Sequence, residues 1–293
     1  MTGVLLSPRM AAASLPRKGA ARRSIAKPRR KRPGSAVSRR SGAARRWRGL
    51  RTWVLAFGRA PGFVQLVVSA VAVVLLWLSV NWIYQVVRKP SELLFPVSGT
   101  LFKTPSETWH SYAPIFRRYS TPTISAEFLA ALAQAEGAGN PVARTYWRWS
   151  WSLKPFELYR PASSSVGMYQ MTDGTFGEAR QLCVRQHAVV DSCWFNGLYM
   201  RVLPSDAVEL TSALLDRQVT DILERHRISA ASSVQKLHLA ATIHLCGAGA
   251  ADLYARHGFR FSPGQRCGDH DPRAYLAKVD MLRSQFARLA QEY

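Results

Sequence analysis

A single uncharged segment, residues 60–87, separates two parts of this 293-residue chain that differ in composition. From Phe63 to Tyr84 the segment is almost continuously apolar. In a helix that rises about 1.5 Å per residue, it is long enough to cross a hydrocarbon core of about 30 Å. We therefore predict a single N-terminal transmembrane helix over residues 60–87. A cleaved signal peptide is the alternative, but its charged and apolar regions would both be abnormally long, and no clear cleavage site follows Val87.

The part before the span is strongly basic. Of the 40 Lys and Arg residues in the chain, seventeen lie in residues 1–59, which contain no Asp or Glu. We predict that this arm is disordered and, by the positive-inside rule, cytoplasmic, so that residues 90–293 lie across the membrane. Nucleic acid is not an expected partner, because no aromatic stacking platform accompanies the charge. Membrane insertion and attraction to anionic lipid headgroups account for the basic arm instead.

The cysteines indicate an oxidising location for the second part. All four follow the predicted span, and an even count suits two disulfides in a compartment such as a bacterial periplasm. Four cysteines allow three connectivities, and we favour Cys183–Cys193 with Cys246–Cys267 because these are nearest in sequence. The histidines form no cluster with the spacing of metal ligands, so neither a metal nor a cofactor is expected.

Beyond the span, Glu136 is a carboxylate at a position where an apolar side chain is expected. Residues 125–136 are rich in helix formers, and Phe128, Leu132 and Glu136 recur at i, i+4 and i+8. The glutamate therefore continues the stripe that faces a core, and the glycines and Asn-Pro pair that follow end the helix. Burial and the negative end of the helix dipole both disfavour the ionised form. We predict a general acid, although a helix-end glutamate is more commonly solvated or paired with arginine.

Three short motifs occur in order along this part of the chain. They are Glu136-Gly137-Ala138-Gly139-Asn140-Pro141, Gly167-Met168-Tyr169-Gln170 and His244-Leu245-Cys246-Gly247. Together they resemble the catalytic domain of lytic transglycosylases of the soluble-lytic-transglycosylase type, a lysozyme-like fold that cleaves peptidoglycan. That family carries Glu-Ser-x-x-Asn-Pro, Gly-Leu-Met-Gln and Tyr-Asn-Ala-Gly in the same order. The resemblance covers roughly residues 120–260.

The resemblance implies roles for individual residues. Glu136 would be the catalytic acid, and His244, at the place of an active-site tyrosine, would be its hydrogen-bonding partner. Gly137 replaces the family's serine, and Leu245 replaces its asparagine. The glycan would be positioned by the second motif, through Gln170 and the backbone of Gly167, Met168 and Tyr169.

An insertion around residues 144–161 lengthens the spacing between the first two motifs. Trp147, Trp149 and Trp151 alternate there, as they would along one side of an extended strand. Indoles stack on sugar rings, but they also fill protein cores and enter bilayers. Glycan contact and packing or membrane contact are therefore both open for this insertion.

The number of carboxylates bears on the mechanism. Ordinary glycosidases use two, whereas between Glu136 and Gln170 the only other acid is Glu157, and Asp173 suits a helix cap. The resemblance implies a reaction with one acid. Glu136 would protonate the glycosidic oxygen after N-acetylmuramic acid, then take a proton from the C6 hydroxyl of that sugar, which closes a 1,6-anhydro ring without water. The prediction is thus a membrane-anchored peptidoglycan lytic transglycosylase, a lyase of the inner membrane that acts in the periplasm.

Two other classes of function stay open. A hydrolytic muramidase would need a second carboxylate placed to activate water, with Asp173 the best candidate. A non-catalytic peptidoglycan-binding or scaffold module would account for the altered third motif. The sequence also leaves open whether the substrate is cleaved for general wall turnover or for a secretion or other cell-envelope machine.

For the fold, we expect a mainly α chain in four parts. They are the disordered arm 1–59, the transmembrane helix 60–87, an extended proline-containing linker 88–121 and a lysozyme-like helical domain 122–293. Within that domain, helices are expected to start at Ser205, at Ser232 or Ser233, near Ala250 and at Asp271-Pro272.

Overall fold

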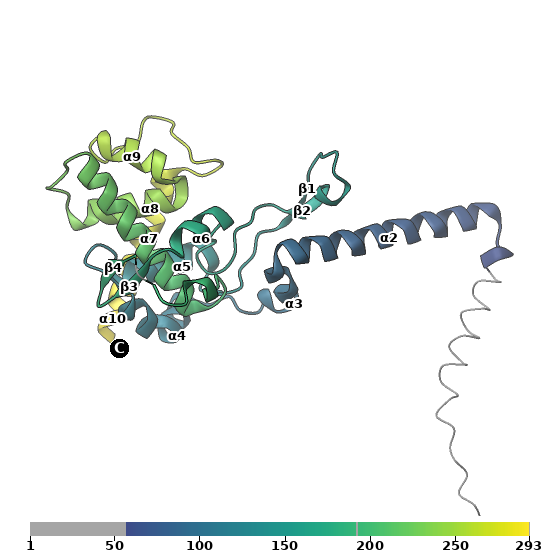
Figure 1. Cartoon of the computed structure of the whole chain (residues 1–293), viewed down its shortest axis with the longest axis horizontal. Helices are drawn as coiled ribbons and strands as arrows, with labels where there is room; N and C mark the ends of the chain where they lie inside the picture. Colours follow the sequence, from purple (N-terminus) through teal and green to yellow (C-terminus); the bar gives the residue numbers. More distant parts are fainter. Residues whose placement is uncertain (1–56, 192, 293) are drawn as a thin grey trace, which may run out of the picture. The chain divides into compact units, whose positions relative to one another are not determined.

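The computed structural model describes residues 57–191 and 193–292, and these residues are mainly helical, with two short antiparallel hairpins (Figure 1). The predicted disorder of the basic arm concerns residues that lie almost wholly outside this range. The chain divides into two compact units, Met1–Val67 and Val68–Tyr293. The first unit contributes the start of helix α2, and the other elements discussed here belong to the second.

Helix α2, Gly62–Arg88, is the predicted apolar span. Among the described residues it is the one helix long and apolar enough to cross a membrane, with a mean hydropathy of 2.5 over its best window. None of that window is buried inside the structure. An apolar helix whose best window is not buried by protein needs another apolar environment, so its length and its exposure both suit a membrane anchor.

The prediction of an extended linker over residues 88–121 is wrong. A 3₁₀ turn, Pro90–Leu94, and the short helix α3, Phe95–Ser98, follow α2 directly. Helix α4, Pro105–Arg118, then occupies much of the segment. The prolines were misleading because Pro105 lies in the first turn of α4, where its missing N–H has no partner to lose.

Helix α4 also belongs to the hydrophobic core. Thr104 and Glu107 form a capping box, in which the Thr104 side chain accepts from the Glu107 N–H and the Glu107 carboxylate accepts from the Thr104 N–H. Trp109, Ala113 and Phe116 then recur at i, i+4 and i+7, and all three are buried. The helical domain therefore begins before residue 105 and not at residue 122.

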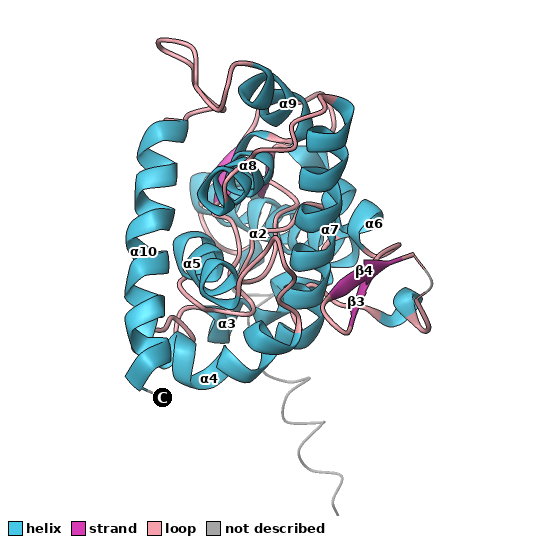
Figure 2. Cartoon of the chain, turned by 90° about the vertical axis from the view of Figure 1, so that its left-hand side faces the viewer, coloured by secondary structure: helices cyan, strands magenta, loops and turns pink. Residues whose placement is uncertain are grey.

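The core is built around helix α5, Ala126–Gly137, whose residues 128–133 are all buried. Helices α4 and α10 pack against α5, and α8 packs against α7 and α9 (Figure 2). Ser232 caps α8 as predicted, whereas α7 starts at Pro204, so that Ser205 lies inside its first turn. The remaining helices are α6 (Asp173–Ala179), α7 (Pro204–Arg225), α8 (Ser233–Cys246), α9 (Ala248–Arg256) and α10 (Pro272–Glu292).

Two hairpins and two disulfides complete the domain. Strands β1, Trp147–Trp149, and β2, Tyr159–Pro161, form the first hairpin within the aromatic insertion. The second hairpin, β3 (Cys183–Arg185) with β4 (Ala188–Val190), was not expected from the sequence. The disulfides are Cys183–Cys193 and Cys246–Cys267, the pairing favoured from sequence proximity, with Cα–Cα distances of 5.9 and 5.1 Å.

The inclusion of α4 in the core can be tested with two phenylalanine substitutions. Phe116→Ala removes a fully buried ring and should lower the free energy of unfolding by about 3–5 kcal/mol. Phe102 is 59% exposed, so Phe102→Ala should change it by no more than about 0.5 kcal/mol. Denaturant unfolding of the full-length chain in detergent measures both. Equal stability of the two variants would restore the linker interpretation.

Candidate active site

Helix α5 delivers Glu136 to the edge of the core. Ser125 caps the start of the helix by accepting from the Phe128 N–H at 3.3 Å. The helix ends at Gly137, directly after Glu136, as predicted. Its left-handed C-cap is Ala138, with a φ of 46°, rather than Gly137. Because the preceding turns of α5 are buried, the Glu136 carboxylate is held on a rigid element. Its side chain is 20% exposed, so the carboxylate is open to a ligand.

The hydrogen-bond partner of Glu136 is Tyr275, a residue of α10. Its hydroxyl donates to Glu136 Oε1 at 2.5 Å. Burial raises the pKa of the Tyr275 phenol well above its usual range, and the Glu136 charge and this hydrogen bond raise it further. Tyr275 is therefore a permanent donor at physiological pH. In the sequence it was only one residue of the apolar stripe of α10, so no local signal separated it from the core positions.

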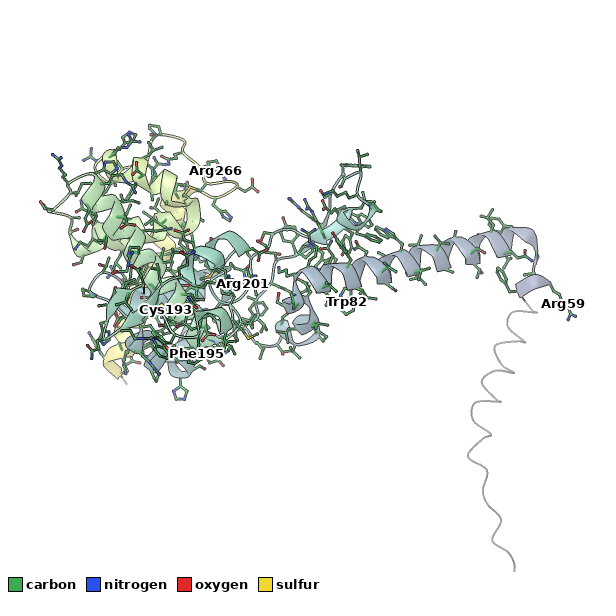
Figure 3. All side chains as sticks on the ribbon, viewed as in Figure 1. Arg59, Trp82, Cys193, Phe195, Arg201 and Arg266 are labelled. Carbon is green, nitrogen blue, oxygen red and sulfur yellow. A yellow bond between two sulfur atoms is a disulfide. The ribbon has the colours of Figure 1, made fainter. Side chains whose placement is uncertain are left out.

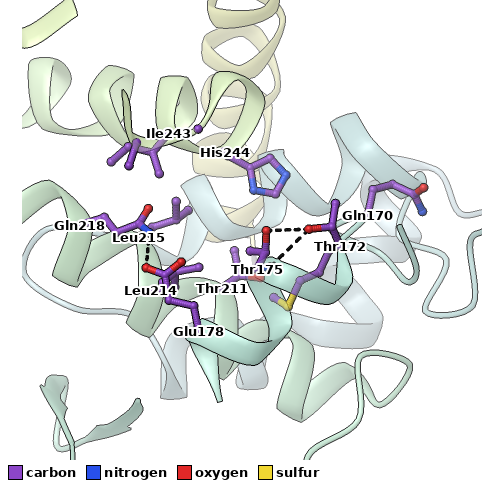
Figure 4. A pocket seen from close by; sticks show the side chains of 13 residues that line it. Gln170, Thr172, Thr175, Glu178, Thr211, Leu214, Leu215, Gln218, Ile243 and His244 are labelled. Atoms are coloured by element: carbon purple, nitrogen blue, oxygen red, sulfur yellow. Dashed lines mark hydrogen bonds between the residues drawn. The ribbon is translucent and has the colours of Figure 1, made fainter. Parts of the chain in front are cut away.

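His244 does not take the role that the sequence assigned to it. Its Nε2 lies 3.9 Å from Glu136 Oε1, which is too long for a hydrogen bond. The predicted direct hydrogen bond is therefore absent, and Oε1 accepts instead from Tyr275, which belongs to a different helix. His244 instead faces a cleft next to Glu136 (Figure 4).

The second motif forms a tight turn in which the backbone packs closely against its neighbours and two of the side chains are buried. Gly167 has a φ of +82°, and a Cβ there would lie 2.3 Å from the Arg201 carbonyl oxygen, so glycine is required. Met168 and Tyr169 are buried, and the Tyr169 hydroxyl donates to the Leu129 carbonyl at 3.1 Å. Both side chains belong to the core, and the predicted contact of their backbone with substrate stays a prediction.

Gln170 is the one side chain of this motif that reaches the cleft. Its Nε2 donates to the carbonyls of Ala143, at 3.1 Å, and Gly167, at 2.9 Å. Its own backbone has a positive φ of 47°, an unusual conformation for a residue other than glycine. The side-chain amide thus closes the turn that carries it, and this holds Gln170 at the edge of the cleft.

The first two motifs touch at Gly137. A Cβ on Gly137 would lie 2.8 Å from both Cα and O of Met168, closer than real side chains approach. The turn of the second motif therefore packs directly on the end of α5. This close approach is the physical reason for a glycine where the resembling family has serine.

The cleft beside Glu136 has a volume of about 280 Å³ and is lined by residues of α6, α7, α8 and the second motif (Figure 4). Its walls carry hydrogen-bonding side chains, among them Thr175, Glu178 and Gln218. Glu178 accepts from Gln218 Nε2 at 2.7 Å. Glu136 does not line this cleft, but His244 does, and its Nε2 lies 3.9 Å from Glu136 Oε1. Sequence reasoning missed Glu178 and Gln218, because residues so far apart in the chain meet only when α6 packs on α7.

Asp173 is neither a helix cap nor a free carboxylate. Thr172 caps α6, and Asp173 is the first residue of that helix. The Asp173 carboxylate accepts from Arg201 at 2.6 Å. Arg201 also donates to the carbonyls of Ser164 and Met171, at 3.1 and 2.8 Å. The ion pair therefore fixes the loop on either side of the second motif.

The chain matches no protein-family model, and a sequence search finds no match to a curated protein. Function is therefore inferred from the residues and their geometry. The site offers one half-buried carboxylate with a neutral phenol as donor, next to a polar cleft. Such a group can deliver a proton to a bound ligand and take one back.

Tyr275→Phe removes the donor of Glu136 and tests whether it supports the predicted acid. Loss of a hydrogen bond to a charged group should lower the predicted cleavage of peptidoglycan about 10- to 100-fold. Tyr254→Phe, at a buried tyrosine that packs on Phe259 and Phe261, is the control. An unchanged cleavage rate in Tyr275→Phe would contradict the role.

The contact between the first two motifs predicts the effect of Gly137→Ser. The new Cβ forces the Met168 backbone away, which should lower the free energy of unfolding by about 1–3 kcal/mol. Gly177→Ser is the matched control, since this glycine also lies in a helix and nothing lies within 4 Å of its Cβ position. Thermal unfolding of both full-length variants in detergent decides the matter, and equal destabilisation would show that the close approach is unimportant.

Proposed function

We propose that this protein is a peptidoglycan lytic transglycosylase anchored in the bacterial inner membrane by α2, with its N-terminal arm in the cytoplasm and its helical domain in the periplasm. The observation that carries the proposal is the pairing of Glu136 with the Tyr275 hydroxyl at the end of a buried helix. The apolar helix, the basic arm before it and the two disulfides after it support the location.

The hydrogen bond assigns different tasks to the two carboxyl oxygens. Oε1 of Glu136 accepts from Tyr275, so Oε2 is the oxygen that carries the transferable proton. In the first step this proton goes to the glycosidic oxygen, and the bond from C1 of N-acetylmuramic acid to that oxygen breaks. Tyr275 stabilises the carboxylate that results, because its hydroxyl donates to Oε1, which shares the negative charge that develops when Oε2 loses its proton.

In the second step the carboxylate acts as a base. It takes the proton of the C6 hydroxyl, whose oxygen bonds to C1 and closes the 1,6-anhydro ring. The other product leaves with a free hydroxyl at C4. The proton that Glu136 gave has been replaced, no water is consumed, and one carboxylate serves both steps.

The carboxylates near the site favour this scheme over ordinary hydrolysis. Hydrolysis requires a second carboxylate that can activate water, and Asp173, the candidate from the sequence, is paired with Arg201. Glu178 lines the cleft but is bonded to Gln218. Glu178 is therefore the residue to test for a hydrolytic mechanism, in place of Asp173.

Glu136→Gln tests the proposal directly. The amide has the size of the acid but no proton to transfer, so folding should be retained. Cleavage of isolated sacculi by the full-length chain in detergent should fall by more than about 10⁴-fold, above the usual value for one proton transfer, because the residue acts in both steps. Glu178→Gln is the matched control and should retain activity. Mass spectrometry of the released fragments identifies their ends.

Each outcome of this experiment distinguishes the candidate functions. Fragments with 1,6-anhydro ends that disappear in Glu136→Gln support the transglycosylase. Fragments with reducing ends, lost in both variants, would identify a hydrolase that uses Glu178. Equal release by the wild type and Glu136→Gln would refute the assignment of Glu136. A wild type that binds sacculi without cleaving them would be a binding module.

A further inference from the structure

The hairpin of the aromatic insertion, residues 144–163, packs along the C-terminal half of α2 (Figure 3). The rings of Trp77 and Trp149 stack with centroids 6.1 Å apart and an angle of 13° between their planes. The rings of Tyr84 and Phe156 also pack together, with centroids 5.4 Å apart. The hairpin and this half of α2 both lie in the second compact unit of the chain. The hairpin thus covers one face of a helix that is otherwise exposed.

Polar side chains of α2 fix the hairpin in place. Asn81 Nδ2 donates to the Tyr159 carbonyl at 2.7 Å, and Gln85 Nε2 donates to the Phe156 carbonyl at 2.6 Å. Although they belong to an exposed helix, Asn81 and Gln85 are only 1% and 5% exposed. Amides facing hydrocarbon without partners are costly, so in a bilayer these bonds would bind the hairpin to the helix.

The base of the hairpin is held by a buried carboxylate just after α2. Glu92 is 1% exposed and lies 3.3 Å from Lys89 and 2.9 Å from Arg144. It also accepts from Trp147 Nε1 at 2.9 Å. The two cations compensate the buried charge of the Glu92 carboxylate, and the indole N–H adds a neutral donor. The direction in which the hairpin leaves the domain is therefore determined by α2 and the turn that follows it.

The tip of the hairpin exposes large apolar side chains to solvent. Trp149 is 68% exposed even though it stacks on Trp77, and Trp151 and Leu153 are fully exposed. Trp77 precedes Arg88 by eleven residues, or about 16 Å along the helix axis, so Trp149 is level with an apolar part of α2. The tip therefore presents its apolar side chains beside a segment that itself suits hydrocarbon.

We propose that the hairpin tip, Trp149, Trp151 and Leu153, inserts into the outer leaflet of the same bilayer that α2 spans. The proposal rests on the proposed membrane anchoring of α2, and it names the lipid bilayer as the partner of the insertion. Indoles favour the interface between headgroups and acyl chains. The basic residues Arg148, Lys154 and Arg160 flank the tip, and although the last two share an ion pair with Glu157, the three outnumber that one carboxylate and suit anionic headgroups. A glycan strand is the weaker candidate, because Trp149 stacks on α2 at a depth that only lipid reaches.

The inserted hairpin would also set the position of the catalytic site. Its two strands lead directly into the first two motifs, since Arg144 and Val166 form a bridge and the Gly167 N–H donates to the Ala143 carbonyl at 2.8 Å. Lys89 donates to the Ser165 carbonyl at 2.9 Å. Hydrogen bonds thus connect the turn that carries Gln170 to the base of the hairpin and to the end of α2, the two elements that would meet the membrane.

Site-directed fluorescence on the full-length chain tests this proposal. All four native cysteines are in disulfides, so one introduced cysteine takes the label. An environment-sensitive fluorophore is placed on Ser152→Cys at the tip, Val74→Cys in α2 or Ser262→Cys in an exposed loop. The chains are reconstituted in phosphatidylcholine–phosphatidylglycerol vesicles that contain lipid with either a shallow or a deep acyl-chain nitroxide. The label at 152 should be quenched at least about twofold by the shallow nitroxide, as expected for a group at the acyl boundary. The label at 74, near the middle of α2, should be quenched by the deep nitroxide, and the label at 262 by neither.

A second pair of variants assigns the insertion to the tip side chains. Trp151→Asp with Leu153→Asp should abolish quenching of the label at 152. Trp194→Asp with Leu198→Asp, at residues 80% and 73% exposed elsewhere in the domain, should leave it unchanged. Neither pair includes a residue of the catalytic site, so activity against sacculi in detergent provides a check on folding.

The outcomes separate this proposal from the one it rests on. Quenching at 74 without quenching at 152 would overturn membrane insertion of the hairpin and leave the anchor intact. Absence of quenching at both positions would overturn the anchor and the hairpin proposal together. If the label at 152 is still quenched in the variant with Trp151→Asp and Leu153→Asp, the tip side chains are not the cause of the quenching. A label at 152 that responds to added soluble glycan strands but not to the quencher lipid would make the tip a glycan contact.

Discussion

The hydrogen bond from Tyr275 to Glu136 is the interaction on which the candidate site depends. The two residues are 139 positions apart in the chain and meet only because α10 packs against α5. A carboxylate at the end of a buried helix needs a partner, since an unsatisfied polar group in such a place is costly. The phenol supplies one without adding a charge. The packing of the last helix, α10, against α5 therefore both completes the core and supplies the donor for Glu136.

The second requirement is close approach of backbones. Gly137 leaves room for Met168, and Gly167 leaves room for the Arg201 carbonyl, so the turn between them sits against the end of α5. The Met168 and Tyr169 side chains then fill the core and fix the turn, and Gln170 is the one residue of the motif that lines the cleft. The residues of the second motif, which the sequence suggested for glycan binding, therefore mainly pack the turn against α5. This packing places Gln170 at the edge of the cleft.

The sequence predicted those parts of the fold that depend on local signals. The helix formers from Ser125, the start expected at Ser232 or Ser233 and the glycines after Glu136 correctly marked ends of α5 and α8, and sequence proximity correctly favoured the two disulfides. The errors share one cause, which is that tertiary contacts decided the outcome. Pro105 was taken as a breaker although α4 is kept in the core by Trp109 and Phe116. The resemblance suggested His244 as the partner of Glu136, and nothing local shows that the last helix brings Tyr275 to the acid instead.

The aromatic insertion connects the apolar helix to the site in a way that neither element indicates alone. In the sequence, Asn81 and Gln85 are two polar interruptions near the end of an apolar run, and the tryptophans are a separate cluster. In the structure the amides bond to the hairpin backbone, and Glu92 holds its base. The strands of the hairpin then continue into the turn that carries Gln170. Under the proposed function, an enzyme fixed at one point could rotate about its anchor. The proposed second contact beside the helix would restrict that rotation and would give the cleft a defined orientation toward the glycan layer.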